Sequence, residues 1–323
     1  LSESDWSILA KGWNMPWDAS GLYVNGVHVS GSNKDVVCKN GYLHLADGVV
    51  TPLRNMAEVI NETQEVSQFS KIMDMFAFPY YNTGVQSTLG NAYGGAMAED
   101  STVFVKRYFN LNDFISDPEG KLDIEGYGAL AYDPSAHNWG GNTDMGVMFV
   151  PTDEAMREYW ESPQGAFLSD KFPQWDSVYT KVLADFVQNH QQRSFADALP
   201  HNWNIMSDPA GFEMNVKESD IVKTIPANNG LIYITNKVYA PVDYQSVYAP
   251  VLISDSTKIM NPVIKNVVDD AYNLKYHFYL RSLDNRYNLL VPSDNAMKTY
   301  RDPISWAIWA NDGIDNREIW TFR

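Results

Sequence analysis

The chain has 323 residues, 45% of them hydrophobic and 20% charged, which suits one large globular domain or two ordinary ones. Its 40 acidic and 24 basic side chains give a formal net charge of -16, so the surface repels phosphate backbones and anionic membranes. We therefore expect no nucleic-acid partner. No run of about 18 apolar residues occurs, so we expect membrane association only through a lipid anchor outside this sequence.

Residues 40–52 are the first predicted element: a turn, a short strand and a stop. Asn40 and Gly41 are expected to supply the positive φ angles of a tight turn, and the alternating apolar residues that follow give one buried face. Pro52 ends the strand because it has no N–H to donate. Just before this element, the single cysteine, Cys38, is expected to be a small buried residue, and a reactive thiol is the alternative.

Two amphipathic helices are predicted from the spacing of their apolar residues. The first covers 64–77, and the second covers 175–192. Residues 102–109 alternate like a strand, and 213–216 form a short strand that leads into 220–222. The side chains expected to face inward are Val66, Phe69, Ile72, Met73 and Phe76 in the first helix and Val178, Val182, Leu183, Phe186 and Val187 in the second.

A strand-to-helix corner is predicted at 149–156, where an apolar strand runs into Pro151. Thr152 stands at the N-cap position of the helix. Asp153 falls in the first turn, where its negative charge suits the helix dipole.

Both the strand and the corner occur twice. Residues 229–241 (NGLIYITNKVYAP) match 40–52 (NGYLHLADGVVTP), and 290–297 (LVPSDNAM) match 149–156 (FVPTDEAM). The two patterns alternate along the chain, which is typical of a folded unit that has been repeated. One unit runs from a corner to an Asn-Gly strand. We therefore predict the C-terminal part of a first domain in 1–58, a complete domain in 59–243 and the N-terminal part of a third domain in 244–323.

The spacing of the two patterns locates an insertion in the complete domain. Asn40 and Pro151 are 111 positions apart. The corresponding Asn229 and Pro292 are only 63 apart, so an excess of 48 residues lies mainly within 79–145. Long insertions on a packed domain often carry function, and an elaboration that binds nothing is the alternative. The residues predicted to form a contact surface in this insertion, which is rich in Tyr, Gly and Asn, are Tyr80, Tyr81, Tyr93 and Trp139.

These motifs resemble the two sequence blocks of the fasciclin domain. Residues 147–156 and 287–297 resemble its first block, in which a strand leads into Pro-Thr/Ser-Asp/Asn and then a bulky apolar residue. Residues 40–52 and 229–241 resemble its second block. The resemblance implies an α+β fold, with a fasciclin-like β-sandwich or wedge core flanked by helices, in tandem repeats. The inserted stretch and residues 301–323 lie outside it.

Smaller elements of the family also have counterparts. Residues 24–29 look like the strand that precedes the family's Asp element, and 35–36 and 220–221 fit that element itself. The family carries a Tyr-His pair near the end of a central helix. Here Asn189 precedes His190, so the tyrosine is missing, and we expect His190 to be structural.

No residue pattern predicts an enzyme. The sequence lacks the GxSxG, HExxH, Walker and dinucleotide-binding motifs, so no catalytic residue and no cofactor site is predicted. Its six histidines have no ligand spacing, so no metal site is predicted either.

The resemblance implies a non-enzymatic surface protein instead. Fasciclin-like proteins are usually secreted or surface-anchored and mediate adhesion or matrix contacts. The insertion resembles versions from Bacteroidota-type bacteria, which are often outer-membrane lipoproteins. We therefore expect an extracellular adhesion or scaffold protein with a protein or surface-glycan partner. The alternative is a glycan-binding accessory lipoprotein of an outer-membrane nutrient-uptake complex, with Trp139 and the tyrosines as the sugar platform; an enzyme is a third alternative.

Overall fold

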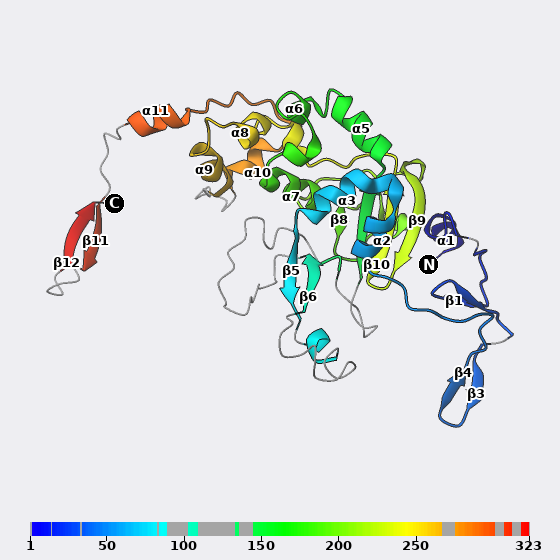
Figure 1. Ribbon diagram of the computed structural model, residues 1–323. Helices are drawn as coiled ribbons and strands as arrows, with labels where there is room; N and C mark the ends of the chain where they lie inside the picture. Colours follow the sequence, from blue (N-terminus) through cyan, green and yellow to red (C-terminus); the bar gives the residue numbers. More distant parts are fainter. Residues whose placement is uncertain are drawn as a thin grey trace. The chain divides into compact units, whose positions relative to one another are not determined.

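The chain divides into two compact units, Leu1–Gln245 and Ser246–Arg323, in the computed structural model (Figure 1). Helices and small sheets are both present, so the expected mixed α+β class is confirmed. The domain boundaries predicted at 58 and 243 stay predictions. The structure describes residues 2–13, 15–32, 34–82, 84–88, 103–108, 133–135, 145–266, 275–300, 307–311 and 318–322.

The first unit is built on a four-stranded sheet with the order β8-β7-β10-β9. Its two central strands, β7 (Gly146–Pro151) and β10 (Gly230–Thr235), run parallel to each other. At the edges, β9 (Ile221–Ala227) pairs antiparallel with β10, and β8 (Gln191–Gln192) pairs antiparallel with β7. The corner strand at 149–151 and the Asn-Gly strand at 230–235 are therefore neighbours in one sheet.

One face of this sheet carries an aromatic core. Phe149 of β7 stacks on Tyr233 of β10 with ring centroids 4.9 Å apart, and Trp203 packs edge-on against Tyr233 at 5.4 Å. Leu9, at the end of α1 (Glu3–Leu9), belongs to the same buried cluster. Side chains of a strand alternate between its two faces, so the residues between these aromatics point to the other side of the sheet.

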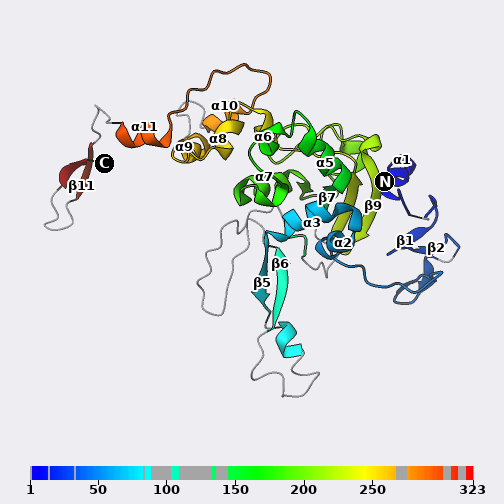
Figure 2. The same cartoon turned by 45° about the horizontal axis from the view of Figure 1, so that its top comes forward.

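That other side is covered by helices. α2 (Met56–Glu62) and α3 (Ser67–Asp74) run across it in both views of the molecule (Figures 1 and 2). A Cβ at Gly230 would lie 2.1 Å from the carbonyl oxygen of Gly146 and 2.7 Å from the side chain of Met56, so only glycine fits there. Every residue of β10 is buried. The expectation of a single buried face for this strand was wrong, because a second layer packs on it.

The Asn-Gly pairs lie at turns but do not adopt the expected conformation. Asn228 and Asn229 form the turn before β10, and Gly230 is already the first residue of the strand. Neither Asn40 nor Asn229 has a positive φ. The expectation of positive φ angles was therefore wrong for both asparagines, because each pair lies one residue later in the turn than we predicted.

The helix predicted over 64–77 is confirmed as a 3-10 turn, Gln64–Val66, followed by α3. All five residues of its predicted inner face are at most 1% exposed. The strand that follows, β5 (Ala77–Tyr81), pairs antiparallel with β6 (Phe104–Tyr108). The predicted strand at 102–109 is thus confirmed over five residues, with alternating burial.

The second predicted helix is shorter than expected. A 3-10 turn, Trp175–Ser177, comes first, and α7 (Thr180–Asn189) begins only after an extended Val178. The five residues of the predicted inner face are nevertheless buried. The strand expected at 213–216 is wrong, since Glu213 makes only an isolated bridge to Ser207.

Both predicted corners have the expected N-cap. The Thr152 hydroxyl accepts a hydrogen bond from the Ala155 amide at 3.2 Å at the start of α5 (Asp153–Glu161). The Ser293 hydroxyl accepts one from the Ala296 amide at 3.3 Å at the start of α11 (Asp294–Thr299). The two caps have nearly the same backbone angles, φ -64° and ψ 159° for Thr152 and φ -69° and ψ 161° for Ser293.

Two small hairpins precede α2. β1 (Leu22–Val24) and β2 (Val27–Val29) join at Asn25-Gly26, whose φ angles of 48° and 86° form a left-handed turn. β3 (Val36–Cys38) and β4 (Gly41–Leu43) form the second hairpin, and all six of these residues are exposed. The expectations of a buried Cys38 and of a half-buried strand after Asn40 were therefore wrong, because no second layer covers this hairpin in the part of the chain that the structure describes.

The second unit is mainly helical. Tyr248 is fully buried in it and packs against His277 with ring centroids 4.6 Å apart. Across all described residues, no helix has the length and apolar character needed to span a bilayer. Besides α11, the second unit contains α8 (Ala249–Ile253), α9 (Met260–Asn266), α10 (Tyr276–Leu280) and an antiparallel pair, β11 (Ala307–Asn311) and β12 (Glu318–Phe322). The short helix α6 (Ala166–Ser169) belongs to the first unit.

Candidate functional site

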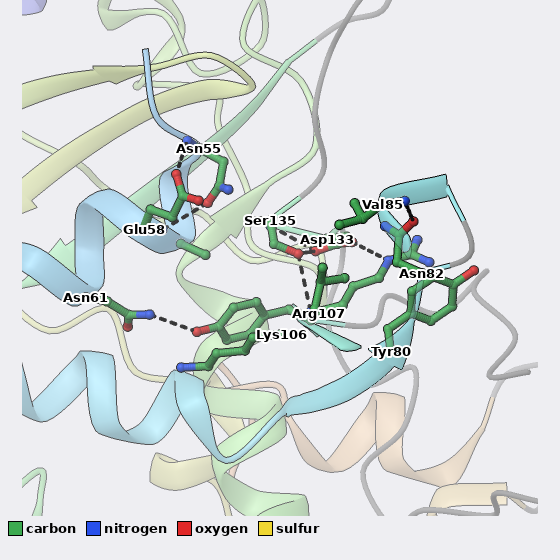
Figure 3. A pocket seen from close by; sticks show the side chains of 13 residues that line it. Asn55, Glu58, Asn61, Tyr80, Asn82, Val85, Lys106, Arg107, Asp133 and Ser135 are labelled. Atoms are coloured by element: carbon green, nitrogen blue, oxygen red, sulfur yellow. Dashed lines mark hydrogen bonds and ion pairs between the residues drawn. The ribbon is translucent and has the colours of Figure 1, made fainter. Parts of the chain in front are cut away.

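A pocket of about 670 Å³ lies where the β5–β6 hairpin, the start of the predicted insertion, meets α2 (Figure 3). This volume is within the range of roughly 300–1,000 Å³ that is usual for small-molecule sites. Its walls come from α2, from both strands of the hairpin and from residues 133–135. The lining residues are Asn55, Ala57, Glu58, Asn61, Tyr80, Asn82, Val85, Val105, Lys106, Arg107, Tyr108, Asp133 and Ser135.

Tyr108 anchors the hairpin at the base of the pocket. Its ring is buried, its hydroxyl donates a hydrogen bond to the Asp74 carboxylate, and it accepts one from the Asn61 amide at 3.1 Å. Burial and the neighbouring Asp74 carboxylate raise the pKa of Tyr108 well above its usual value, so the phenol stays protonated as a donor. Lys106 reaches the same carboxylate at 2.7 Å.

An ion pair fixes the opposite wall. The Arg107 Nε lies 2.9 Å from Asp133 Oδ2, and the Asp133 side chain is only 3% exposed. The same carboxylate accepts hydrogen bonds from the backbone amide and the hydroxyl of Ser135, at 2.8 and 2.6 Å. The Arg107 guanidinium lies over the Tyr80 ring, 4.9 Å from its centroid, which is a cation–π geometry.

The segment 133–135 is fastened to the core sheet by a single asparagine. The Asn229 side chain is buried and donates to the Pro134 carbonyl at 2.9 Å. Its amide oxygen accepts from the backbone N–H of Met56, also at 2.9 Å, at the first residue of α2. Ala57 donates its own N–H to the same Pro134 carbonyl at 3.1 Å. The two walls of the pocket therefore share one attachment to the turn between β9 and β10.

The chemistry of the pocket is polar and directional. Amide groups of Asn55, Asn61 and Asn82, the Glu58 carboxylate and the Lys106 ammonium line the pocket and supply both donors and acceptors, and Asn82 lies on the same side of it as Tyr80 (Figure 3). Such a set suits a ligand with many hydroxyl groups or a polar peptide segment. Among the described residues, no group of three or more His, Cys, Asp and Glu side chains is placed to hold a metal ion.

Of the four predicted contact residues, the structure places one in the pocket. Tyr80 is half-buried and lines it. Tyr81 is the last residue of β5, opposite Phe104, and its side chain lies outside the description. Tyr93 and Trp139 lie outside the described residues.

The charged residues of the pocket were not predicted from the sequence. In β6, Arg107 falls on the same face as Val105, which is opposite Tyr80 in the hairpin. A charged residue on the half-buried face of a predicted strand was a signal that a partner is nearby. The identity of that partner, Asp133, could not be derived because 26 residues separate the two.

His190 lies in the core, away from the pocket. It is fully buried, its Nδ1 is 2.8 Å from the Phe186 carbonyl, and its Nε2 accepts from the Tyr239 backbone N–H at 3.1 Å. Burial lowers the pKa of His190 to about 4, so its ring is neutral and Nδ1 carries the proton. Nδ1 thus bonds within α7 and Nε2 joins the end of α7 to the segment after β10, which is a structural role.

Comparison with known proteins assigns no function to the chain. The resemblance of four short blocks to the fasciclin domain stays a prediction. No protein-family model and no curated protein matches the chain.

Proposed function

We propose that the chain is a non-enzymatic cell-surface adhesion or scaffold protein that holds its partner at the pocket between α2 and the β5–β6 hairpin. The observation that carries this proposal is the position of the pocket. One wall belongs to the helical layer of the domain body, and the other is the first hairpin of the 79–145 insertion. An insertion that forms half of a pocket has a role beyond packing.

The state of the charged groups favours binding over chemistry. Arg107 is paired with Asp133, and Lys106 and the Tyr108 hydroxyl both contact Asp74. These groups hold one another in place, so they offer a rigid, preorganised surface. The described lining contains no histidine or cysteine, and its serine hydroxyl, Ser135, donates to the Asp133 carboxylate that Arg107 already holds in an ion pair.

The tandem fasciclin-like architecture and the surface location are parts of the same proposal. They are supported by the two corners, whose N-caps have matching geometry, and by the sequence resemblance. Export to the cell surface, with an outer-membrane anchor outside this sequence, follows from the resemblance.

A second candidate function is a glycan-binding accessory lipoprotein of a nutrient-uptake complex. The specific observation in its favour is the lining of the pocket, which combines amide, carboxylate and ammonium groups with the half-buried ring of Tyr80. Sugar hydroxyls both donate and accept hydrogen bonds, and sugar rings stack on aromatic faces.

Binding assays on the full chain separate the two candidates. The wild type is tested on a glycan array and against purified matrix and outer-membrane proteins, with and without their glycans. Binding to isolated glycans favours the second candidate, and binding to deglycosylated protein favours the first. If the wild-type chain binds neither glycans nor proteins, both candidate functions are overturned.

Point variants test whether the pocket is responsible. Loss of the ring in Tyr80→Ala removes a contact of about 0.5–1.5 kcal/mol, which is roughly a two- to thirteenfold weaker affinity. Tyr80→Phe keeps the ring and is expected to bind almost as well as the wild type. The matched control is Tyr300→Ala, which removes a tyrosine that is 64% exposed in the second unit. Equal binding by Tyr80→Ala and the wild type would refute the assignment of the pocket.

A further inference from the structure

The first unit shows how a corner strand and an Asn-Gly strand fit together. β7 and β10 are parallel, and Met148 lies opposite Ile232 while Val150 lies opposite Ile234. These four side chains are fully buried and point to the face that the helices cover. The pairing of the two motifs is therefore a template for any other copy of the same two motifs in this chain.

The second corner carries the same tertiary contact as the first, in addition to the same N-cap. The Asp153 carboxylate accepts from the Gln68 amide at 2.7 Å, at the start of α3. The Asp294 carboxylate accepts from the Lys258 and Ile259 amides at 3.1 and 2.9 Å, just before α9. In each case the aspartate of the corner binds backbone amides where an earlier helix begins.

The sequence distances agree with this correspondence. Asp153 and Gln68 are 85 residues apart, whereas Asp294 and Lys258 are 36 apart, a difference of 49. The insertion deduced from the motif spacing accounts for 48 of these residues. The second unit therefore contains the beginning of the same module, folded in the same way around its corner.

The segment before the second corner, which the motif predicts to be a strand, has no strand partner in the described part of the chain. Residues 287–292 lie outside any strand, and Leu290 is 93% exposed. Leu289, Leu290 and Val291 all border an apolar groove of about 580 Å³, together with residues of α9 and α10, but only Leu289 and Val291 are half-buried there. By the repeat, Leu289 corresponds to Met148 and Val291 to Val150, so the groove lies on the face that helices cover in the template.

The other Asn-Gly strand of the chain is equally exposed. Residues 41–46 are all exposed, with Tyr42 at 68%, Leu43 at 48% and Leu45 at 53%. By the repeat, Leu43 corresponds to Ile232 and Leu45 to Ile234. The chain thus contains counterparts of both β7 and β10, in residues 287–292 and 41–46. Each counterpart has two apolar side chains at the positions that face the helices in the first unit.

We propose that residues 41–46 of one copy of this chain pair in parallel with residues 287–292 of a second copy. The register copied from β7 and β10 places Leu43 beside Leu289 and Leu45 beside Val291, so that both leucines cover the apolar groove. Among the described residues β4 pairs only with β3, as β10 pairs with β9 in the first unit, so its other edge is open to a strand from a second copy. Addition of a strand to such an edge is a common mode of recognition. Because each copy has both halves, the contact is head-to-tail and can extend beyond a dimer.

Single-cysteine proteins test the pairing and its register together. In a Cys38→Ser background, Leu43→Cys is made in one protein and Leu289→Cys in a second protein that carries a size tag. Mixing the two under mild oxidation is expected to give the disulfide-linked heterodimer. In the control mixture, Leu290→Cys replaces Leu289→Cys and is expected to give only background, since a shift by one residue turns the side chain to the opposite face. Equal yields from the two mixtures, or no heterodimer from either, would overturn the proposal.

Analytical ultracentrifugation over a range of concentrations supplies the second measurement. Wild type and Cys38→Ser are expected to associate as concentration rises. Leu43→Asp is expected to remain monomeric with an unchanged circular dichroism spectrum, since Leu43 is 48% exposed in the single chain. Val49→Asp is the matched control, because Val49 is 84% exposed and lies outside 41–46.

Two further results would refute the assembly. One is a wild-type chain that stays monomeric at every concentration, and the other is association of Leu43→Asp with the wild-type affinity. A Leu43→Cys, Leu289→Cys double variant that closes within one molecule and does not dimerise would likewise exclude the second copy as the occupant. The inference rests on the repeat that the proposed function also assumes, but it uses none of the pocket residues, so the cross-linking and the pocket-binding experiments fail separately.

Discussion

Truncation of the same motif position in the two copies is expected to have very different effects on stability. Phe149 and Leu290 are equivalent in the corner motif, but Phe149 is 0% exposed and Leu290 is 93% exposed. Phe149 stacks on Tyr233 at 4.9 Å and lies edge-on to Tyr239 at 5.8 Å, so Phe149→Ala removes a ring from the centre of the sheet. Buried Phe→Ala changes cost about 3–5 kcal/mol, whereas an exposed substitution stays within about 0.5 kcal/mol.

The assay is thermal and urea unfolding of the full chain at a concentration low enough to keep it monomeric. For a folding unit of this size, about 3–5 kcal/mol lowers Tm by roughly 6–20 °C. Unfolding is followed both by tryptophan fluorescence and by circular dichroism, because two compact units need not unfold together. Phe149→Ala is expected to lower the transition of the first unit, and Leu290→Ala to move no transition. A cost below about 1 kcal/mol for Phe149→Ala, or similar costs for the two variants, would contradict the reasoning.

Three other predictions concern a cap, a histidine and the hairpin anchor. Thr152→Ala removes the N-cap of α5 and is expected to cost about 0.5–2 kcal/mol in urea unfolding, while Thr152→Ser should restore most of it; no loss would exclude the cap as a stabilising contact. The Asp18 carboxylate lies 2.9 Å from His28 Nε2 and raises the pKa of His28 above 6.5. The protonated His28 ring therefore stabilises the β1–β2 hairpin fully below pH 6.5, and this stabilisation is lost as pH rises through the higher pKa of the folded state. An NMR titration of the His28 ring checks this, and a midpoint at or below 6.5 would contradict it. Tyr108→Phe removes the hydrogen bond to Asp74 and is expected to destabilise the hairpin by about 1.5–3 kcal/mol, seen as faster amide hydrogen exchange in β5 and β6; unchanged exchange would show that the phenol is not its anchor.

The elements that could be predicted from the sequence are those with local causes. Thr152 and Ser293 could be recognised as N-caps because a cap depends only on the residues within one helical turn. The inner face of 64–77 could be recognised because its apolar spacing and its burial follow the same helical period. The alternation in 104–108 likewise needed only neighbours in the chain.

The predictions that were wrong concern the burial of strands, which depends on the layers that pack on them. The strands after Asn40 and Asn229 have the same pattern, yet one is exposed and the other is buried on both faces. That difference is set by helices and strands distant in sequence, so no local pattern could reveal it. The prediction of a buried Cys38 was wrong for the same reason, because no local pattern shows whether another layer covers its strand. α2 was not predicted, although Asn55 and Glu58 form a capping box at its start, because this stretch was expected to be the end of a domain.

The attachment of the pocket through Asn229 has a practical consequence. Any ligand that contacts Asp133 or Ser135 must bind a segment whose Pro134 carbonyl is held by the turn of the central sheet. Unfolding of the sheet releases that segment, so occupancy of the pocket and melting of the first unit are thermodynamically linked. A screen of unlabelled compounds by differential scanning fluorimetry therefore detects ligands of the first unit: a compound present at about 100 times its Kd adds roughly 2.7 kcal/mol to the stability of the folded state, whatever its chemical identity.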